Sequence, residues 1–280
     1  MKKYSIGKFA KYSGVTPDFI KYYEKHHIMI PSVEPNGYRS YEMPDFATLN
    51  ECIKYRDMGF SASDIESLLK DNDYESTLSI LNSNIPLLKK QLFHLQEIIK
   101  YTEELSRELP KYKEKNPWTL QDGDEMYYLP ISENFEYIKD KCISDLLAVW
   151  QKYHPAVLSA ARVDLRSITT EEKTGSEMDG IQWGVLISKK SQQMLELLIN
   201  DKVEAIPVQK YLTVFDRRLV PPRSDNNYPQ KLKRTMFYHT ENVLQKYPFH
   251  VIGPSFFIVR SKITENGARY TYQKVMTPIE

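Results

Sequence analysis

The sequence predicts an α+β protein built from an N-terminal winged helix-turn-helix, a long helix, and a C-terminal α/β domain of two βαββ-type halves. Two helical segments flank a Gly-containing turn near the N-terminus, a heptad repeat follows, and strands alternate with helices from residue 125 onward. The expected boundaries are 1–75 for the winged helix-turn-helix, 76–110 for a helical dimerisation segment (coiled coil about 84–109), 111–124 for a linker, and 125–280 for the last domain.

The first of these parts depends on local signals for helix ends. Gly14 accepts the backbone angles of a tight turn, so it ends the first helix. Thr16 suits an N-cap and Pro17 suits the first helical position, so a second helix begins there. This layout is typical of a helix-turn-helix. Lys21, Tyr22 and Lys25 on the second helix form a cation–aromatic mix suited to phosphates and base edges.

A wing is predicted directly after this helix. Residues 35–37 read Pro-Asn-Gly, a strong hairpin signal, and the β-prone residues 38–41 follow as a return strand. Arg39 lies between two phenols, where it can grip a phosphate. Two further helices are expected, over 45–58 and from the cap Ser61 to Leu69.

The charge is unevenly distributed, although the formal net charge is only +1. Residues 1–41 hold seven Lys or Arg against three acids, a balance of +4, and residues 42–75 hold three against nine, a balance of −6. The basic surface therefore coincides with the predicted reading head, as phosphate contact requires.

A narrow apolar stripe predicts a two-stranded seam. Apolar residues recur at steps of three and four, and polar side chains occupy the other faces. The predicted dimerisation residues are Ile85, Leu88, Leu92, Leu95 and Ile99. A short helix after Tyr74 is expected to precede a new helix capped by Asn84. The alternative is a helix packed on its own domain.

Strands and helices alternate in the last part of the chain. Strands are predicted over 126–131, 181–187, 209–216, 255–261 and 269–276, helices over 135–153 and 228–247, and a loop over 166–180. The order strand–helix–strand–strand occurs twice. Two similar halves that pack sheet to sheet are therefore expected.

Residues 4–69 resemble the MerR family of transcriptional regulators. The matching residues are Tyr4, Ile6, Gly7, Ala10, Gly14, Val15, Tyr22, Tyr23, Glu24, Pro31, Gly37, Tyr38, Arg39, Tyr41, Asp45, Leu49, Ile53, Arg56, Gly59, Phe60, Ser61, Ile65, Leu68 and Leu69. The family usually has Arg in place of Lys21 and Gly in place of His27. Lys21 keeps the charge but loses the two-pronged donor geometry of Arg.

The MerR resemblance implies double-stranded promoter DNA as a partner, an antiparallel coiled-coil homodimer, and RNA polymerase at the promoter. It implies an activator that bends and untwists promoter DNA when a ligand binds. The DNA-binding residues it suggests are Thr16, Lys21, Tyr22, Lys25, Tyr38, Arg39, Tyr41 and Arg56.

Residues 125–280 resemble the GyrI-like effector domain of multidrug-sensing members, chiefly through 205–215 and 275–279. The resemblance implies a small aromatic or drug-like ligand, and aromatic side chains could stack on it. The ligand-binding candidates are Tyr127, Cys142, Trp183, Tyr211 and Tyr272. Ordinary core packing is the alternative for each aromatic residue. No acid stands in residues 270–274, where cation sensors carry one, so either the ligand is neutral or anionic, or Glu177 or Asp179 substitutes.

Other functions find little support in the sequence. No catalytic pair, metal-ligand spacing or phosphate loop is recognisable, so neither an enzyme nor a cofactor is predicted. Two distant cysteines and the lack of any long apolar run predict a cytoplasmic protein without a membrane span. A ligand-independent DNA-binding repressor with a structural C-terminal domain, and an esterase-like enzyme with a DNA arm, remain as alternatives.

Overall fold

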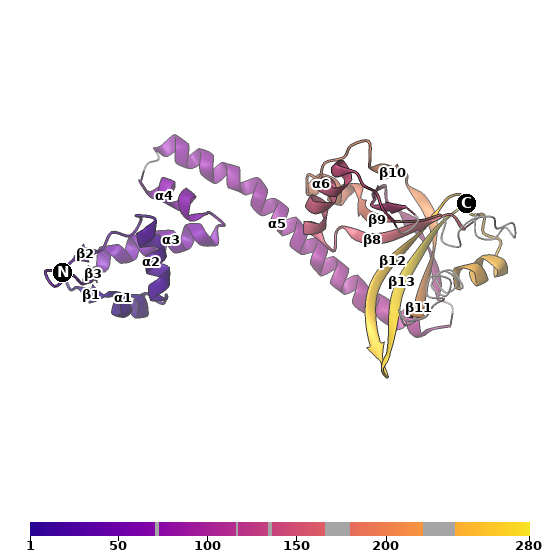
Figure 1. Cartoon of the computed structure of the whole chain (residues 1–280), viewed down its shortest axis with the longest axis horizontal. Helices are drawn as coiled ribbons and strands as arrows, with labels where there is room; N and C mark the ends of the chain where they lie inside the picture. The colour runs from indigo at the N-terminus through magenta and orange to yellow at the C-terminus, as the bar shows by residue number, and fades with distance from the viewer. Residues whose placement is uncertain (71–72, 116, 134–135, 166–179, 221–238) are drawn as a thin grey trace. The chain divides into compact units, whose positions relative to one another are not determined.

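The structure is a computed structural model that describes residues 1–70, 73–115, 117–133, 136–165, 180–220 and 239–280. It divides into two compact units, residues 1–89 and residues 90–280, which are considered separately below. Figure 1 labels the elements of both units along the chain.

The first unit contains the predicted helix-turn-helix. Its elements are β1 (Tyr4–Ser5), α1 (Ile6–Ser13), α2 (Pro17–Lys25), β2 (Ser32–Val33), β3 (Arg39–Tyr41), α3 (Met43–Asp57) and α4 (Ala62–Lys70). Gly14 ends α1 with a φ of 71°, and the Thr16 hydroxyl accepts a hydrogen bond from the Phe19 amide at 3.2 Å. Both signals act within a few residues of chain, which is why the sequence predicted this motif.

A small antiparallel sheet in the order β1-β3-β2 lies beside these helices. Val33 pairs with Arg39 across the turn, and Gly37 has a φ of 80° in it, so the predicted hairpin is present. The apolar core of the unit includes Phe9, Ile20, Tyr23, Leu49 and Ile65.

The long helix α5 (Tyr74–Glu108) differs from the prediction of two helices. The helix continues through Pro86, and Asn84 does not cap a new helix. Its side-chain amide instead donates to the Met58 carbonyl at 2.8 Å, which satisfies the acceptor left at the end of α3. The Asp73 carboxylate caps α5 by accepting from the Ser76 amide at 2.8 Å.

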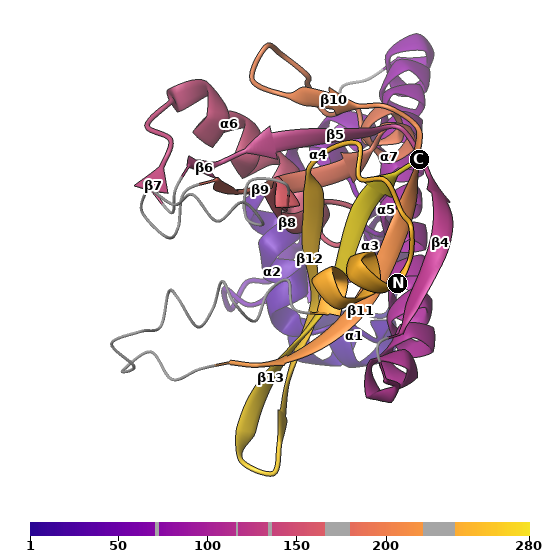
Figure 2. The same cartoon turned by 90° about the vertical axis from the view of Figure 1, so that its right-hand side faces the viewer.

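The second unit is organised around one antiparallel sheet. The elements that follow α5 are η1 (Leu109–Lys113), β4 (Trp118–Gly123), β5 (Met126–Pro130), β6 (Ser132–Glu133), β7 (Glu136–Tyr137), α6 (Lys141–Trp150), η2 (Gln151–Tyr153), β8 (Leu158–Val163), β9 (Ile181–Ser188), α7 (Lys189–Met194), β10 (Glu204–Ile206), β11 (Gln209–Leu219), β12 (Ser255–Glu265) and β13 (Ala268–Ile279). Among the described residues, eight strands pair in the order β10-β5-β9-β8-β12-β13-β11-β4. Figure 2 shows this sheet from a direction in which most of its strands can be followed.

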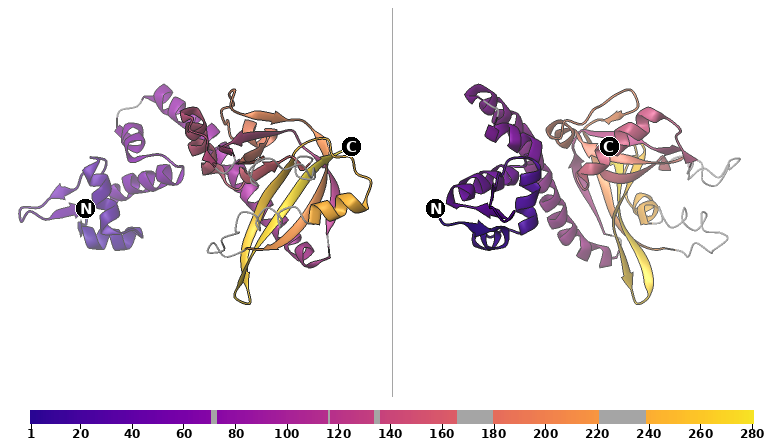
Figure 3. Two further views of the ribbon diagram at one scale, coloured as in Figure 1. Left: turned by 45° about the vertical axis from the view of Figure 1, so that its right-hand side comes forward. Right: turned by 60° about the vertical axis from the view of Figure 1, so that its left-hand side comes forward.

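The two halves join differently from the sequence prediction. Strand β8 pairs with β12 from Ala160–Ile258 to Val163–Ser255, so the halves meet edge to edge in one sheet. The prediction that they pack sheet to sheet is therefore wrong. The strands β12 and β13 extend together as a long ribbon, which Figure 3 shows in two orientations.

Each face of the sheet has its own cover. Alternation along the strands places Leu129, Val185 and Val275 on one face. The helices α6 and 239–246 pack on that face. Tyr128, Leu186 and Met276 lie on the opposite face, and the end of α5 and η1 contact its cations and aromatic rings.

Three other sequence predictions need correction. The linker expected over 111–124 contains β4, which pairs with β11 at the sheet edge. The helix expected over 135–153 begins only at Lys141, after the short strand β7. The strand β8 was not predicted, because its small residues lack a clear alternation. The loop predicted over 166–180 and residues 228–238 of the last predicted helix lie largely outside the described residues.

Candidate nucleic-acid interface

The helix α2 presents cations and an aromatic ring to solvent. Lys21, Tyr22 and Lys25 are exposed, as the cation–aromatic pattern predicted. The Lys21 ammonium lies 3.0 Å from the Asp18 carboxylate, and both groups are well exposed. Such an exposed pair is weak and screened by salt, so Lys21 stays available to another anion. The Tyr22 ring packs edge-on to His26 at 4.8 Å, which limits its rotation.

A chain of three side chains connects α2 to the hairpin. Arg39 on β3 forms an ion pair with Glu24 on α2, and the Tyr41 hydroxyl donates a hydrogen bond to the same carboxylate. Glu24 is nearly buried, whereas half of the Arg39 side chain remains exposed. The Glu24 carboxylate therefore holds Arg39 at the surface, and the Tyr41 hydroxyl holds that carboxylate in turn.

Tyr41 does not have the place that the family resemblance suggested. Its side chain is fully buried, and its ring stacks on Phe9 at 5.0 Å between centroids. Burial, and then the hydrogen bond to the negative Glu24, raise the pKa of Tyr41 well above its usual range, so the phenol stays a donor. Full burial does not fit the direct DNA contact suggested for Tyr41, and its hydrogen bond to Glu24 suits a role in positioning Glu24 and, through it, Arg39.

A second group of predicted residues lines a single hollow of about 450 Å³. Thr16, Tyr22 and Arg56 contribute to its wall, together with Ser61, which precedes α4. The Arg56 guanidinium lies 5.1 Å from the centre of the Phe19 ring, and the Arg56 side chain is exposed. A guanidinium near the start of two helices suits an anion such as phosphate.

Tyr38 occupies the hairpin tip, where three quarters of its surface is exposed. Its amide donates to the Asn36 side chain at 3.0 Å, which shapes the turn around Gly37. The structure thus brings seven of the eight predicted DNA residues to exposed positions. Sequence reasoning missed the role of Glu24, although a lone acid between two tyrosines and Lys25 was a visible signal.

The predicted seam residues on α5 form an exposed apolar stripe. Ile85, Leu88, Leu92, Leu95 and Ile99 are between 39% and 58% exposed. A helix that exposes a row of large apolar side chains to water, at steps of three and four, loses the free energy that their burial would give. Within the residues that the structure describes, no other element of the single chain buries this stripe.

The predicted ligand residues lie on both sides of the large sheet. Tyr127 and Trp183 belong to the face covered by helices. Tyr211 and Tyr272 are fully buried on the opposite face, where the Tyr211 hydroxyl accepts from Gln209 at 2.7 Å. Cys142 is exposed on α6. These five residues therefore do not converge on one cavity of the described structure.

Sequence reasoning also missed a cluster of buried charges on the second face. Arg260 on β12 and Lys274 on β13 both contact Glu108 at the end of α5, at 2.9 and 3.3 Å. The spacing of charged residues in a sequence does not tell whether a charge is buried or exposed, so the sequence did not indicate this cluster. Glu177 and Asp179, considered as substitutes for the missing acid, lie outside the described residues.

Residues 4–72 match the family described as "MerR HTH family regulatory protein". A regulator of Pseudomonas aeruginosa, described as the uncharacterized HTH-type transcriptional regulator PA4778, is 35% identical over 106 residues, which are 36% of this chain and 74% of that protein. The chain belongs to the MerR family of transcriptional regulators. Its first unit is the DNA-binding part of a MerR regulator, and the exposed residues of α2 and the hairpin are the candidates for that contact.

Two further comparisons cover very different shares of the chain. The regulator ZntR of Escherichia coli is 42% identical over 67 residues, 24% of this chain and about half (48%) of its own length. A cryo-EM structure of an EcmrR–DNA complex in EcmrR-RPo aligns with 99% of both chains at 16% identity and a TM-score of 0.33. At that score the alignment assigns neither a ligand nor a partner to this MerR-family member.

Neither a metal-binding cluster nor a helix able to span a membrane occurs in the described part of the chain. Within it, no three His, Cys, Asp or Glu side chains come together as a metal site. None of its helices combines the length and apolar character needed to span a bilayer.

Proposed function

We propose that this MerR-family regulator is a ligand-responsive activator that works as a homodimer on promoter DNA. Helix α2 of each subunit would enter successive major grooves of an inverted repeat, with β2–β3 as a wing on the flanking phosphates. A small aromatic or drug-like molecule, bound by a GyrI-like second unit, would change how the dimer bends and untwists the DNA for RNA polymerase. The site of action would be the cytoplasm.

The observation that carries the dimer is the exposed stripe on α5. Covering its five apolar side chains in an antiparallel coiled coil would remove them from water, and the apolar area removed sets the gain, about 25 cal/mol per Å². The opposite side of α5 packs on its own sheet through Phe93, Tyr101 and Glu108. The helix is therefore occupied on one side only, and a second copy fits the free side.

The DNA contact rests on the charge and shape of the first unit. Lys21, Lys25 and Arg56 supply point charges and a guanidinium fork, while Tyr22 and Tyr38 supply flat surfaces. Lys21 reads bases less strictly than an Arg would, because its ammonium has no fixed donor geometry. Discrimination at that position should therefore be softer than at a position read by Arg.

The ligand response rests on the continuity of α5. The same helix donates from Asn84 to Met58 in the first unit and accepts from Arg260 through Glu108 in the second. A change in how the sheet holds Glu108 would alter the end of the helix that also carries the seam. Ligand and DNA must then influence each other's binding to the same extent.

In-vitro transcription from the promoter upstream of the protein's own gene is the test. Reactions with RNA polymerase are run with the full chain, with and without planar aromatic compounds. Ligand-dependent transcription supports the activator. Binding that only lowers transcription, whatever compound is added, favours the alternative of a ligand-independent repressor with a structural C-terminal domain.

A further inference from the structure

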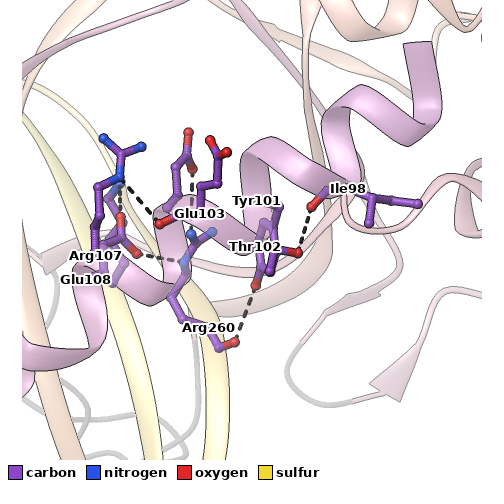
Figure 4. A network of polar contacts seen from close by, with 9 residues as sticks. Ile98, Tyr101, Thr102, Glu103, Arg107, Glu108 and Arg260 are labelled. Carbon is purple, nitrogen blue, oxygen red and sulfur yellow. Dashed lines mark hydrogen bonds and ion pairs between the residues drawn. The ribbon is translucent and has the colours of Figure 1, made fainter. Parts of the chain in front are cut away.

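Arg260 is a deeply buried cation of the second unit with a partly exposed acid, Glu104, as a neighbour. Only 3% of its side chain is exposed, beneath the last turns of α5. Its Nε donates to Glu108 at 2.9 Å, and the guanidinium lies 4.2 Å from the centre of the Tyr101 ring. Figure 4 shows Tyr101, Glu108 and Arg260 in this network. Lys274 shares Glu108 at 3.3 Å.

One donor of this guanidinium is not satisfied. Its Nη2 atom is buried, and among the described residues it has no hydrogen-bond partner. The Glu104 carboxylate stands 3.6 Å from Nη2, which is too far for a hydrogen bond, and about a third of the Glu104 side chain is exposed. A buried charged donor without an acceptor is costly, so a better-placed acceptor would be bound there.

A cavity of about 140 Å³ is lined in part by the Arg260 side chain. Arg260, Glu104 and Tyr101 line it from one side, and Leu158 and Leu186 line it from the sheet. Lys100 and Glu97 also border it, with the Glu97 carboxylate accepting from Ser191 at 3.1 Å. The cavity is smaller than the roughly 300–1,000 Å³ of drug-sized pockets, so it suits a ligand of about one ring.

The unsatisfied donor favours an anion in this cavity. The cations Arg260, Lys100 and Lys274 stand against the acids Glu97, Glu104 and Glu108, and Glu104 is the acid that engages Arg260 weakly. When the half-buried Glu104 turns to solvent, one positive charge is left unbalanced beside an apolar wall. A cationic ligand would leave the Nη2 donor without an acceptor and would be repelled by Arg260 and Lys100.

We propose that the cavity between α5 and β12 binds a small carboxylate with an apolar body, with its carboxylate on Nη2 of Arg260 in place of Glu104. This inference rests on the proposed ligand response and names the chemical class of its ligand. The guanidinium that receives the ligand also grips Glu108, so occupancy changes how firmly the sheet holds the end of α5.

Calorimetric titration of the full chain with acetate, butyrate, phenylacetate and benzoate tests the proposal. Benzoate or phenylacetate should bind, and benzamide, which has the same shape without the charge, should bind about tenfold more weakly. Benzylamine should not bind. Equal binding of benzamide or benzylamine, or no binding of any carboxylate, overturns the anionic site.

Variants locate the site. Arg260→Gln should abolish benzoate binding, and Arg217→Gln is the matched control, because Arg217 lies on the same face, pairs with Glu265 and does not line the cavity. Loss of binding in Arg217→Gln alone would place the ligand elsewhere. Since Arg260→Gln leaves Glu108 without its main partner, the decisive variant is Glu104→Gln, which keeps Arg260. It should tighten benzoate binding roughly three- to fivefold, and unchanged or weaker binding counts against the proposal.

The same titrations in the presence of promoter DNA separate this site from the ligand response. Benzoate binding that needs Arg260 but leaves DNA affinity and transcription unchanged supports the site and overturns the response. Transcription that responds to another compound, with no carboxylate binding, overturns the site and leaves the response in place.

Discussion

Replacement of Tyr41 by Phe tests whether this residue positions Arg39 or contacts DNA. The substitution removes one oxygen and retains the ring that stacks on Phe9. It therefore leaves packing unchanged and deletes the hydrogen bond to the Glu24 carboxylate. Hydrogen bonds to charged groups contribute about 1.5–3 kcal/mol, so we expect the first unit to lose about 2 kcal/mol of stability. That loss corresponds to an open state that is about thirtyfold more populated at equilibrium.

The two units can be followed separately in the intact chain. Trp118, Trp150 and Trp183 all belong to the second unit, so tryptophan fluorescence during urea unfolding reports that unit. Hydrogen exchange of peptides from residues 1–57 reports the first. Tyr41→Phe should accelerate exchange in these peptides about thirtyfold and leave the fluorescence transition in place.

Tyr38→Phe is the matched control, because Tyr38 is exposed on the same hairpin. It should leave exchange unchanged. In Tyr41→Phe the affinity for DNA should fall modestly with an unchanged salt slope, since no phosphate contact is removed. Normal exchange together with a large loss of DNA affinity would show that Tyr41 touches DNA and would refute the positioning role.

Three other predictions concern single positions. Arg39→Ala should weaken binding to specific and random DNA about equally and flatten the salt slope by about one unit; lost discrimination at an unchanged slope would contradict a phosphate role. His27 has a φ of 55°, so His27→Gly should stabilise the first unit by about 1 kcal/mol in chemical unfolding, and no gain would mean that the left-handed backbone is not strained there. Leu92→Asp and Leu95→Asp should give monomers in sedimentation, whereas the exposed polar position Gln91→Asp should not; a dimer that survives both Leu variants would place the seam elsewhere.

Local signals made the first unit predictable. Gly14, Thr16, Pro17 and Gly37 act on their own neighbours, and each acts in the structure as its residue type suggests. The departure at His27 did not change the local geometry that a Gly would give. The backbone of His27 adopts the left-handed conformation that is usual for Gly. The sequence alone could not decide between this conformation and an altered helix end.

Non-local pairing limited the prediction of the second unit. Strand β4 follows a charged run and looks like linker, but it completes the sheet edge against β11, far away in sequence. Likewise, the alternation of buried and exposed side chains within each strand could be seen in the sequence. Which side chains of different strands share a face of the sheet depends on the strand order, which the sequence does not give. Tyr127 and Tyr211 are both aromatic strand residues near the predicted pocket, yet the register β5-β9 and β11-β13 places them on opposite faces.

The misreading of α5 has a different cause. Pro86 removes one backbone donor and usually ends or bends a helix, so a break near Asn84 was the reasonable expectation. The helix continues through Pro86 all the same, and it carries two stripes of side chains on opposite sides. Ile85, Leu92 and Ile99 follow one stripe, while Glu97, Tyr101 and Glu108 follow another at similar spacing on the far side.

The second stripe bears on why the regulator keeps buried charges at all. An apolar cluster of the same volume would stabilise the contact between α5 and the sheet at least as well, since desolvation cancels much of the gain from Arg260 and Glu108. An apolar contact, however, cannot be exchanged for a ligand group of matching charge. The Arg260 guanidinium has one close carboxylate, Glu108, and one distant carboxylate, Glu104. It can exchange Glu104 for another acceptor at small cost, because Glu104 is already partly exposed to solvent. Buried charge at this position therefore fits a contact that must be both specific and reversible.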